Sequence, residues 1–176
     1  MTLVMLLVSF TKADGLMKRH NAEKQWEEER FFFSSGDYES YEYCCSQLYP
    51  EMKHNYPFLY EYAYSLFMNG KLLQSEDNVE QAMRLCCNSL LFNLLGDIHK
   101  VQERPDEAEQ DYMNAFYVLP YRLYPLSRLA RLYYDNGDII KFRNIVDCIK
   151  RFRPRVESAS TRQIRAEVDE LAAGIE

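Results

Sequence analysis

The stretch "FNLLGDIHKVQERPDEAEQDYMNAFYVLP", residues 92–120, repeats its pattern 34 positions further along the chain. Its landmarks are apolar or small side chains followed by a closing proline. Most of these landmarks keep their type one period later, so that Gly96 is followed by Ala130 and Pro120 by Pro154. A fixed period of this length indicates a repeated structural unit.

The repeated unit reads as a helical hairpin. Apolar and small side chains recur at i, i+3, i+4 and i+7 over residues 92–99, and the same helical spacing returns over residues 108–115. Pro105 suits the first turn of the second helix, where its missing N–H costs nothing. We expect Gly96 and Ala108 to let the two helices approach closely. A single hairpin cannot cover its own apolar face, so copies must stack into a solenoid.

The same register extends upstream, with one offset of 33 residues that the loop near 86–88 must absorb. Three of the turns between paired helices carry a glycine that can adopt a positive φ: "SGDY", "NGKL" and "NGD". In the third copy, Arg104 and Pro105 stand at this turn instead. Residues 158–176 place apolar side chains on one helical line, with Ser158 or Ser160 as the N-cap, and are interpreted as a capping helix.

A helix–turn–helix of 34 residues, with Gly at the close-packing position and a closing proline, resembles the tetratricopeptide repeat. This resemblance implies an all-α fold, a right-handed superhelix of about four hairpins plus a C-terminal capping helix. The predicted organisation is an apolar stub at 1–11, a juxtamembrane linker at 12–21, the solenoid at 22–157 and the capping helix at 158–176.

The apolar run "LVMLLVSF", residues 3–10, is too short to cross a bilayer, which takes about 20 residues. Two interpretations stay open: the end of a transmembrane helix whose upstream part lies outside this sequence, or an apolar helix packing on the first repeat. Lys12, Lys18 and Arg19 follow the run and favour the cytoplasmic side for what comes after it.

No catalytic, metal or cofactor site is predicted. His20 and His54 have no partner at the spacing of a metal site or a nucleophile–base pair, and His99 lies on a repeating helix face. The five cysteines are an odd number that includes adjacent pairs, which favours small packing residues in a reduced protein. An enzyme with an unrecognised helical active site is the third and least favoured hypothesis.

The charge of the chain disfavours nucleic acid as a partner, because the formal net charge is −6. Basic residues are nevertheless concentrated in residues 122–156, above all in "KRFRPR" at 150–155. Three interpretations stay open for this region: contact with a membrane surface, contact with an acidic partner, or a solvated face.

We expect a protein or peptide ligand to bind on the concave side of the solenoid, which the first helix of each hairpin lines. Aromatic and basic side chains often dominate the energy of such interfaces. The predicted groove residues are Trp26, Arg30, Tyr60, Tyr64, Phe67, Asn93, Asp97, Lys100, Arg131 and Tyr134, with Ser127 beside them. The Asn and Lys placement of repeats that clamp a C-terminal carboxylate is not reproduced.

A narrower resemblance covers residues 22–173. The junction "PYRLYP" at 120–125 and "VES" at 156–158 are similar to the C-terminal tetratricopeptide tail of O-antigen ligase/polymerase-like membrane proteins of Bacteroides-type bacteria. The resemblance implies a non-catalytic interaction module at the bacterial inner membrane, in surface-polysaccharide ligation or polymerisation. It carries over no catalytic residue. The alternatives are a periplasmic or soluble cytoplasmic protein, and a free-standing adaptor unrelated to glycans.

Overall fold

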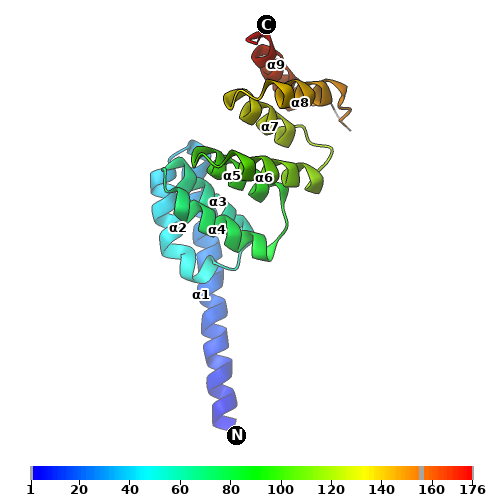
Figure 1. Ribbon diagram of the computed structural model, residues 1–176. Helices are drawn as coiled ribbons and strands as arrows, with labels where there is room; N and C mark the ends of the chain where they lie inside the picture. The colour runs from blue at the N-terminus through cyan, green and yellow to red at the C-terminus, as the bar shows by residue number, and fades with distance from the viewer. Residues whose placement is uncertain (1, 155–156, 176) are drawn as a thin grey trace. The chain divides into compact units, whose positions relative to one another are not determined.

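The computed structural model describes residues 2–154 and 157–175, and the side chains from residue 14 onward. Within that part the chain is α-helical, with nine helices joined by short turns (Figure 1). The helices are α1 (Thr2–Ser35), α2 (Tyr38–Met52), α3 (Tyr56–Met68), α4 (Leu72–Leu85), α5 (Ser89–Val101), α6 (Pro105–Val118), α7 (Tyr124–Asp135), α8 (Ile139–Arg151) and α9 (Ala159–Ala173).

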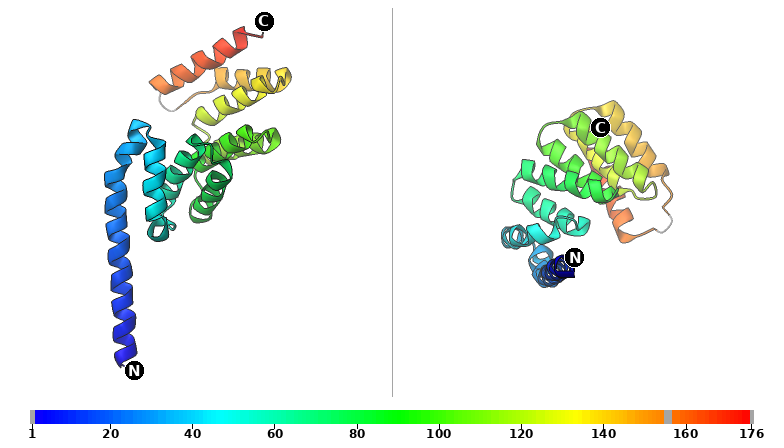
Figure 2. Two further views of the ribbon diagram at one scale, coloured as in Figure 1. Left: turned by 90° about the vertical axis from the view of Figure 1, so that its left-hand side faces the viewer. Right: turned by 90° about the horizontal axis from the view of Figure 1, so that it is seen from below.

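The chain divides into two compact units at Cys86 and Cys87. In the first unit α1 pairs with α2 and α3 with α4; in the second, α5 pairs with α6 and α7 with α8. Helix α9 packs against both α7 and α8, as Figure 2 shows. Consecutive antiparallel hairpins followed by a capping helix confirm the predicted all-α, tetratricopeptide-type fold class.

The turn inside each hairpin has one conformation in all four copies. Its central residue has a positive φ: 82° at Gly36, 74° at Gly70, 60° at Glu103 and 70° at Gly137. The next N–H bonds to the carbonyl five residues earlier, a helix-ending motif that satisfies otherwise unpaired carbonyls. These N···O distances are 2.9 Å for Asp37 to Phe32, 2.8 Å for Lys71 to Leu66, 2.9 Å for Arg104 to His99 and 2.9 Å for Asp138 to Tyr133.

The third turn corrects a detail of the sequence analysis. Arg104 and Pro105 do not replace the glycine; Glu103 occupies that position, 33 residues after Gly70 and 34 before Gly137. Glu103 therefore holds a left-handed backbone conformation that costs a residue with a Cβ roughly 1–2 kcal/mol. The repeat imposes this conformation even where the sequence does not supply glycine.

Helix α5 and helix α6 approach closely at Gly96, as the sequence analysis predicts. A Cβ atom at Gly96 would lie 2.5 Å from Cε1 of Tyr112, whose side chain is fully buried. Ala108 is fully buried as well. The aromatic ring therefore occupies the space that any larger residue at position 96 would need.

Three helices begin where the prolines and the N-cap predicted from the sequence place them. Pro105 is the first residue of α6, and Pro125 lies in the first turn of α7. Ser158, rather than Ser160, is the N-cap of α9, and its side chain accepts a hydrogen bond from the Thr161 N–H at 3.1 Å.

Helix α1 runs without a break from Thr2 through the predicted linker at 12–21 into the first repeat. Figures 1 and 2 show its first half extending beyond the other helices of its unit. No helix in the described part of the chain is long and apolar enough to cross a membrane. The side chains of residues 3–10 lie outside the described ones. The apolar stub and the linker therefore stay predictions, as do the two interpretations of the stub as the end of a transmembrane helix or as a helix that packs on the first repeat.

Replacing Gly96 with alanine should destabilise the second unit by about 1–3 kcal/mol, because the added methyl group overlaps the ring of Tyr112 in a packed core. The measurement is urea unfolding followed by circular dichroism. Gly15→Ala is the matched control, since its Cβ would meet nothing within 4 Å; this change should stabilise helix α1 by about 0.5–1 kcal/mol. A Gly96→Ala variant as stable as wild type, or stabilised as Gly15→Ala should be, would contradict the packing.

Candidate functional site

In the first unit, a buried carboxylate holds two of the predicted groove residues. Glu61 on α3 is 6% exposed and accepts hydrogen bonds from Trp26 and Arg30 of α1. The Arg30 guanidinium lies 2.6 Å from Glu61 Oε1, and the Trp26 indole N–H donates to Glu61 Oε2 at 3.2 Å. Tyr41 on α2 donates its O–H to the same carboxylate at 2.5 Å. Glu61 is not among the residues predicted from the sequence.

The predicted aromatic residues of α3 form a second cluster in this unit. The rings of Tyr60 and Tyr64 have centroids 6.3 Å apart, and Tyr64 also packs on Phe33 and Tyr38, each at 5.6 Å. Phe67 is half-buried on the same helix. Much of the predicted aromatic surface of this unit is thus engaged in contacts within the protein.

In the second unit, two predicted groove residues make hydrogen bonds within the unit. Asn93 is 5% exposed, and its amide nitrogen donates to the Ser89 carbonyl at 2.8 Å. Asp97 accepts from Tyr112 at 2.7 Å and from the Arg128 guanidinium at 2.6 Å. Burial raises the pKa of Asp97, while Arg128 and the Tyr112 hydroxyl oppose this shift by favouring the carboxylate. Arg128 was not predicted, although it stands two repeats after Glu61.

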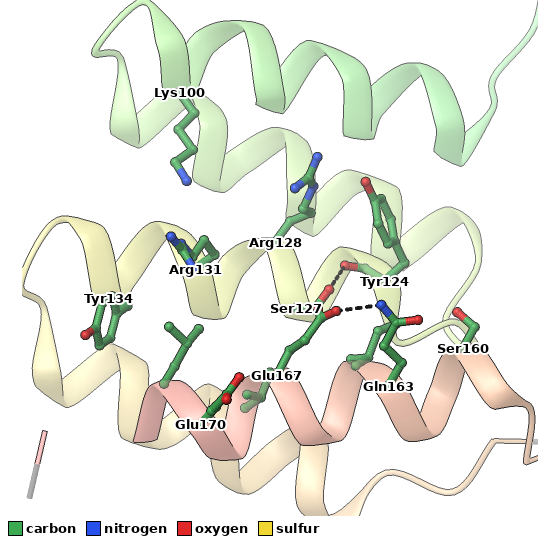
Figure 3. Close-up of a pocket in the computed structure, with 13 residues that line it drawn as sticks. Lys100, Tyr124, Ser127, Arg128, Arg131, Tyr134, Ser160, Gln163, Glu167 and Glu170 are labelled. Carbon is green, nitrogen blue, oxygen red and sulfur yellow. Dashed lines mark hydrogen bonds between the residues drawn. The ribbon is translucent and has the colours of Figure 1, made fainter. Parts of the chain in front are cut away.

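The other predicted residues of this unit, Lys100, Arg131 and Tyr134, come together in a hollow of about 750 Å³ (Figure 3). One wall consists of α7 with Lys100 of α5, and the other is α9. The lining side chains are Lys100, Tyr124, Ser127, Arg128, Arg131, Tyr134, Ser160, Gln163, Ile164, Glu167, Val168, Glu170 and Leu171.

The two walls of the hollow carry opposite charges. Lys100 and Arg131 both pair with Asp135, at 2.6 Å and 3.2 Å, on the first wall. Glu167 and Glu170 project from α9 on the other side, where Gln163 donates to Glu167 at 2.8 Å. The α9 wall also carries Ile164, Val168 and Leu171, of which Ile164 and Val168 are buried in the core of the unit and Leu171 is half-buried. Such a surface can take an apolar side chain and bind polar groups on either side of it.

A smaller hollow of about 310 Å³ adjoins the first. It shares Tyr124, Ser160 and Ile164 with the larger one and adds Tyr121 and Arg122 from the loop before α7. The motif residues Arg122 and Tyr124 therefore lie at this site, whereas Val156 is outside the described residues. Sequence analysis missed the contribution of α9, which it interpreted as a cap only. The polar series Gln163, Glu167 and Glu170, spaced i, i+4 and i+7, was the available signal.

None of the described histidines and cysteines lines either hollow. His20 and His54 are exposed, and His99 is buried with Nδ1 2.6 Å from Oδ2 of Asp111. All five cysteines are free thiols, and burial raises the pKa of Cys45. Among the described residues, no group of His, Cys, Asp and Glu could hold a metal ion.

Comparison with solved structures identifies the fold. A crystal structure of MamA superposes with a TM-score of 0.63 at 12% identity, over 88% of this chain and 80% of that one. The first TPR domain of Spaghetti (RPAP3) bound to the HSP90 peptide SRMEEVD gives 0.60 at 17% identity, over 66% and 93%. PilF of Pseudomonas aeruginosa gives 0.63 at 12% identity, over 86% and 69%.

These solved structures are tetratricopeptide proteins, and the likeness establishes that fold for the present chain. The chain matches no protein-family model, and no curated protein matches its sequence.

Asp111 should make the second unit less stable as pH rises from about 4 to 6. Burial raises the pKa of this carboxyl from its ordinary 3.8 to about 6, with the His99 hydrogen bond opposing the shift. The folded state therefore binds the proton more tightly, so the contribution of this carboxyl to stability is fully present below pH 3.8 and is lost as the pH rises to about 6, by at most about 3 kcal/mol. Chemical denaturation across this range should show the slope.

Asp111→Asn should remove that slope, because the amide does not titrate. The exposed Asp77→Asn change in α4 is the control and should leave the slope in place. An unchanged slope in Asp111→Asn would show that burial of this carboxyl does not govern the pH dependence.

Proposed function

We infer that the chain is a non-catalytic protein-interaction module that binds an extended polypeptide segment in the hollow between α7 and α9. The observation that carries this proposal is the hollow itself: about 750 Å³, with oppositely charged walls that also present aromatic and apolar side chains. Ligand sites are typically concave, largely apolar and equipped with a few polar groups that fix orientation.

A polypeptide suits this lining better than other ligands. An apolar side chain can rest on Leu171 and on the rings of Tyr124 and Tyr134, while Ser127 and Gln163 offer polar groups to a peptide backbone. A nucleic acid would be repelled by the α9 wall, where Glu167 and Glu170 lie, and by the net charge of −6. None of the described side chains lining the hollow is a histidine or cysteine, which favours binding over catalysis. The RPAP3 domain, which shares the fold, was solved with a bound peptide.

Filling the hollow should abolish peptide binding. Peptides of about 12 residues would be selected from a random display library on the wild-type protein, and their affinity measured by fluorescence anisotropy. We expect Ser127→Trp to weaken them at least about tenfold, because the indole occupies the space between the walls.

The matched control is Ser46→Trp on α2. Ser46 and Ser127 both bond to the carbonyl three residues earlier, at 2.7 Å to Tyr43 and 2.8 Å to Tyr124. Ser46 does not line the hollow. Equal affinity of the selected peptides for wild type and Ser127→Trp would overturn the proposed site.

The finer proposal is that this module is the tail of a bacterial inner-membrane protein of surface-polysaccharide ligation or polymerisation, on the cytoplasmic face. The similarity of residues 120–125 to the junction of such tails supports it, and Arg122 and Tyr124 of that junction line the smaller hollow. The basic last repeat supports membrane contact only in part. Lys141 and Lys150 are already paired with Glu109 and Asp169, at 2.7 and 3.5 Å. The free-standing soluble adaptor remains the alternative.

Sequencing the DNA upstream of the Met1 codon tests this context. We expect an in-frame extension that encodes several apolar segments of about 20 residues each, as a multi-helix membrane part requires. A promoter and ribosome-binding site directly before that codon would instead support the free-standing adaptor. Either result leaves the peptide site itself untouched.

A further inference from the structure

The two units contain the same inter-hairpin ion pair with its charges exchanged. In the first unit, Arg30 of α1 binds Glu61 of α3 at 2.6 Å. In the second, Asp97 of α5 binds Arg128 of α7, also at 2.6 Å. The partners are 31 residues apart in both units, and each residue stands 67 positions, one 34-residue and one 33-residue step, from its counterpart.

Both pairs include a carboxylate that depends on its partner. The Glu61 side chain is 8% exposed and that of Asp97 is 14% exposed. Each also accepts a hydrogen bond from a tyrosine of a second helix, Tyr41 or Tyr112. A buried charge that loses its partner is strongly destabilising, and a buried charge facing one of the same sign more so.

The exchange of charges distinguishes correct from incorrect stacking of hairpins. Each of these pairs joins the first helices of two consecutive hairpins. If the α1–α2 hairpin stacked on the α7–α8 hairpin, Arg30 would face Arg128. If the α5–α6 hairpin stacked on the α3–α4 hairpin, Asp97 would face Glu61. Repeats of one fold otherwise present similar apolar faces to one another, and inter-repeat misassembly and domain swapping are their characteristic failures.

We propose that the exchanged Arg30–Glu61 and Asp97–Arg128 pairs are a selectivity device that prevents a hairpin from stacking on the wrong hairpin, in its own chain or in a second copy. Polar pairs that fix which helices associate are the best-attested use of buried charge. The proposal concerns the stacking of hairpins and requires no ligand, although Arg128 also lines the hollow.

A second set of ion pairs provides an internal control. Glu42 binds Lys71 in the first unit and Glu109 binds Lys141 in the second, at 2.5 and 2.7 Å. Glu42 and Glu109 are again 67 positions apart, but here the acidic residue comes first in both units. Lys71 and Lys141 are 70 positions apart and so do not stand at equivalent positions of the repeat, and these pairs serve only as a control for inverting an inter-hairpin charge.

The test inverts the pairs in the full-length chain. Arg30→Glu with Glu61→Arg gives both units the same charge order, as does Asp97→Arg with Arg128→Asp. Each protein is refolded from urea at high concentration, and the fraction with the hydrodynamic size of native wild type is measured by light scattering after gel filtration. We expect each double variant to lose at least about half of this fraction to larger, hairpin-exchanged species.

The quadruple variant, which combines both inversions, separates the proposal from simple destabilisation. It loses the tyrosine hydrogen bonds of both carboxylates. If the pairs only add stability, it should therefore refold to a smaller native-sized fraction than either double variant. The proposal expects the opposite, a recovery above either double variant, because the charge orders differ again. Inverting Glu42–Lys71 should leave the fraction at the wild-type level.

A double variant that refolds like wild type, or a quadruple variant no better than the doubles, overturns the proposal. If a double variant does not fold at all, the quadruple variant still decides the question by recovering or failing to recover.

Discussion

The contact between Gly96 and the ring of Tyr112 sets the positions of the side chains that lead to the proposed ligand site. Because position 96 has no Cβ, the ring lies against the backbone of α5, and its hydroxyl reaches Asp97 at 2.7 Å. Asp97 in turn holds Arg128 of α7, and Arg128 lies over the ring of Tyr124 at 5.1 Å. Arg128 and Tyr124 belong to the wall of the hollow. Packing within one hairpin thus determines the surface presented by the next.

Charge pairing within the repeats limits what is left for a ligand. Arg30 and Asp97 were expected to face a partner, but each satisfies a charge of the neighbouring hairpin. What remains accessible around the hollow is a mixture of tyrosine, serine and glutamate with Lys100 and Arg131, whose charges are shared with Asp135. Recognition there would depend on shape and an apolar anchor more than on net charge, which is consistent with a peptide ligand.

The fold could be predicted from the sequence because hairpins that stack on one another repeat with a fixed period. Small residues, prolines and turn glycines recur at that period. Glu103 shows the limit of this reasoning: the backbone there is fixed by the repeat, although the residue type gives no sign of it. In the candidate site, the hollow brings together Lys100, Arg131 and Tyr134 of the predicted groove, whose role in binding stays a prediction. The burial of Asn93 could not be foreseen, because periodicity identifies a helix face but not which neighbouring side chain will cover it. The wall formed by α9 was missed although its polar series was visible in the sequence.

The most direct measurement is a double-mutant cycle on the free energy of unfolding, with Tyr112→Phe and Arg128→Met. If Tyr112, Asp97 and Arg128 act as one unit, the two changes should be coupled by at least about 0.5 kcal/mol, because both remove a partner of the same buried carboxylate. Additive changes would contradict the account, since Tyr112 would then have no influence on the wall of the hollow.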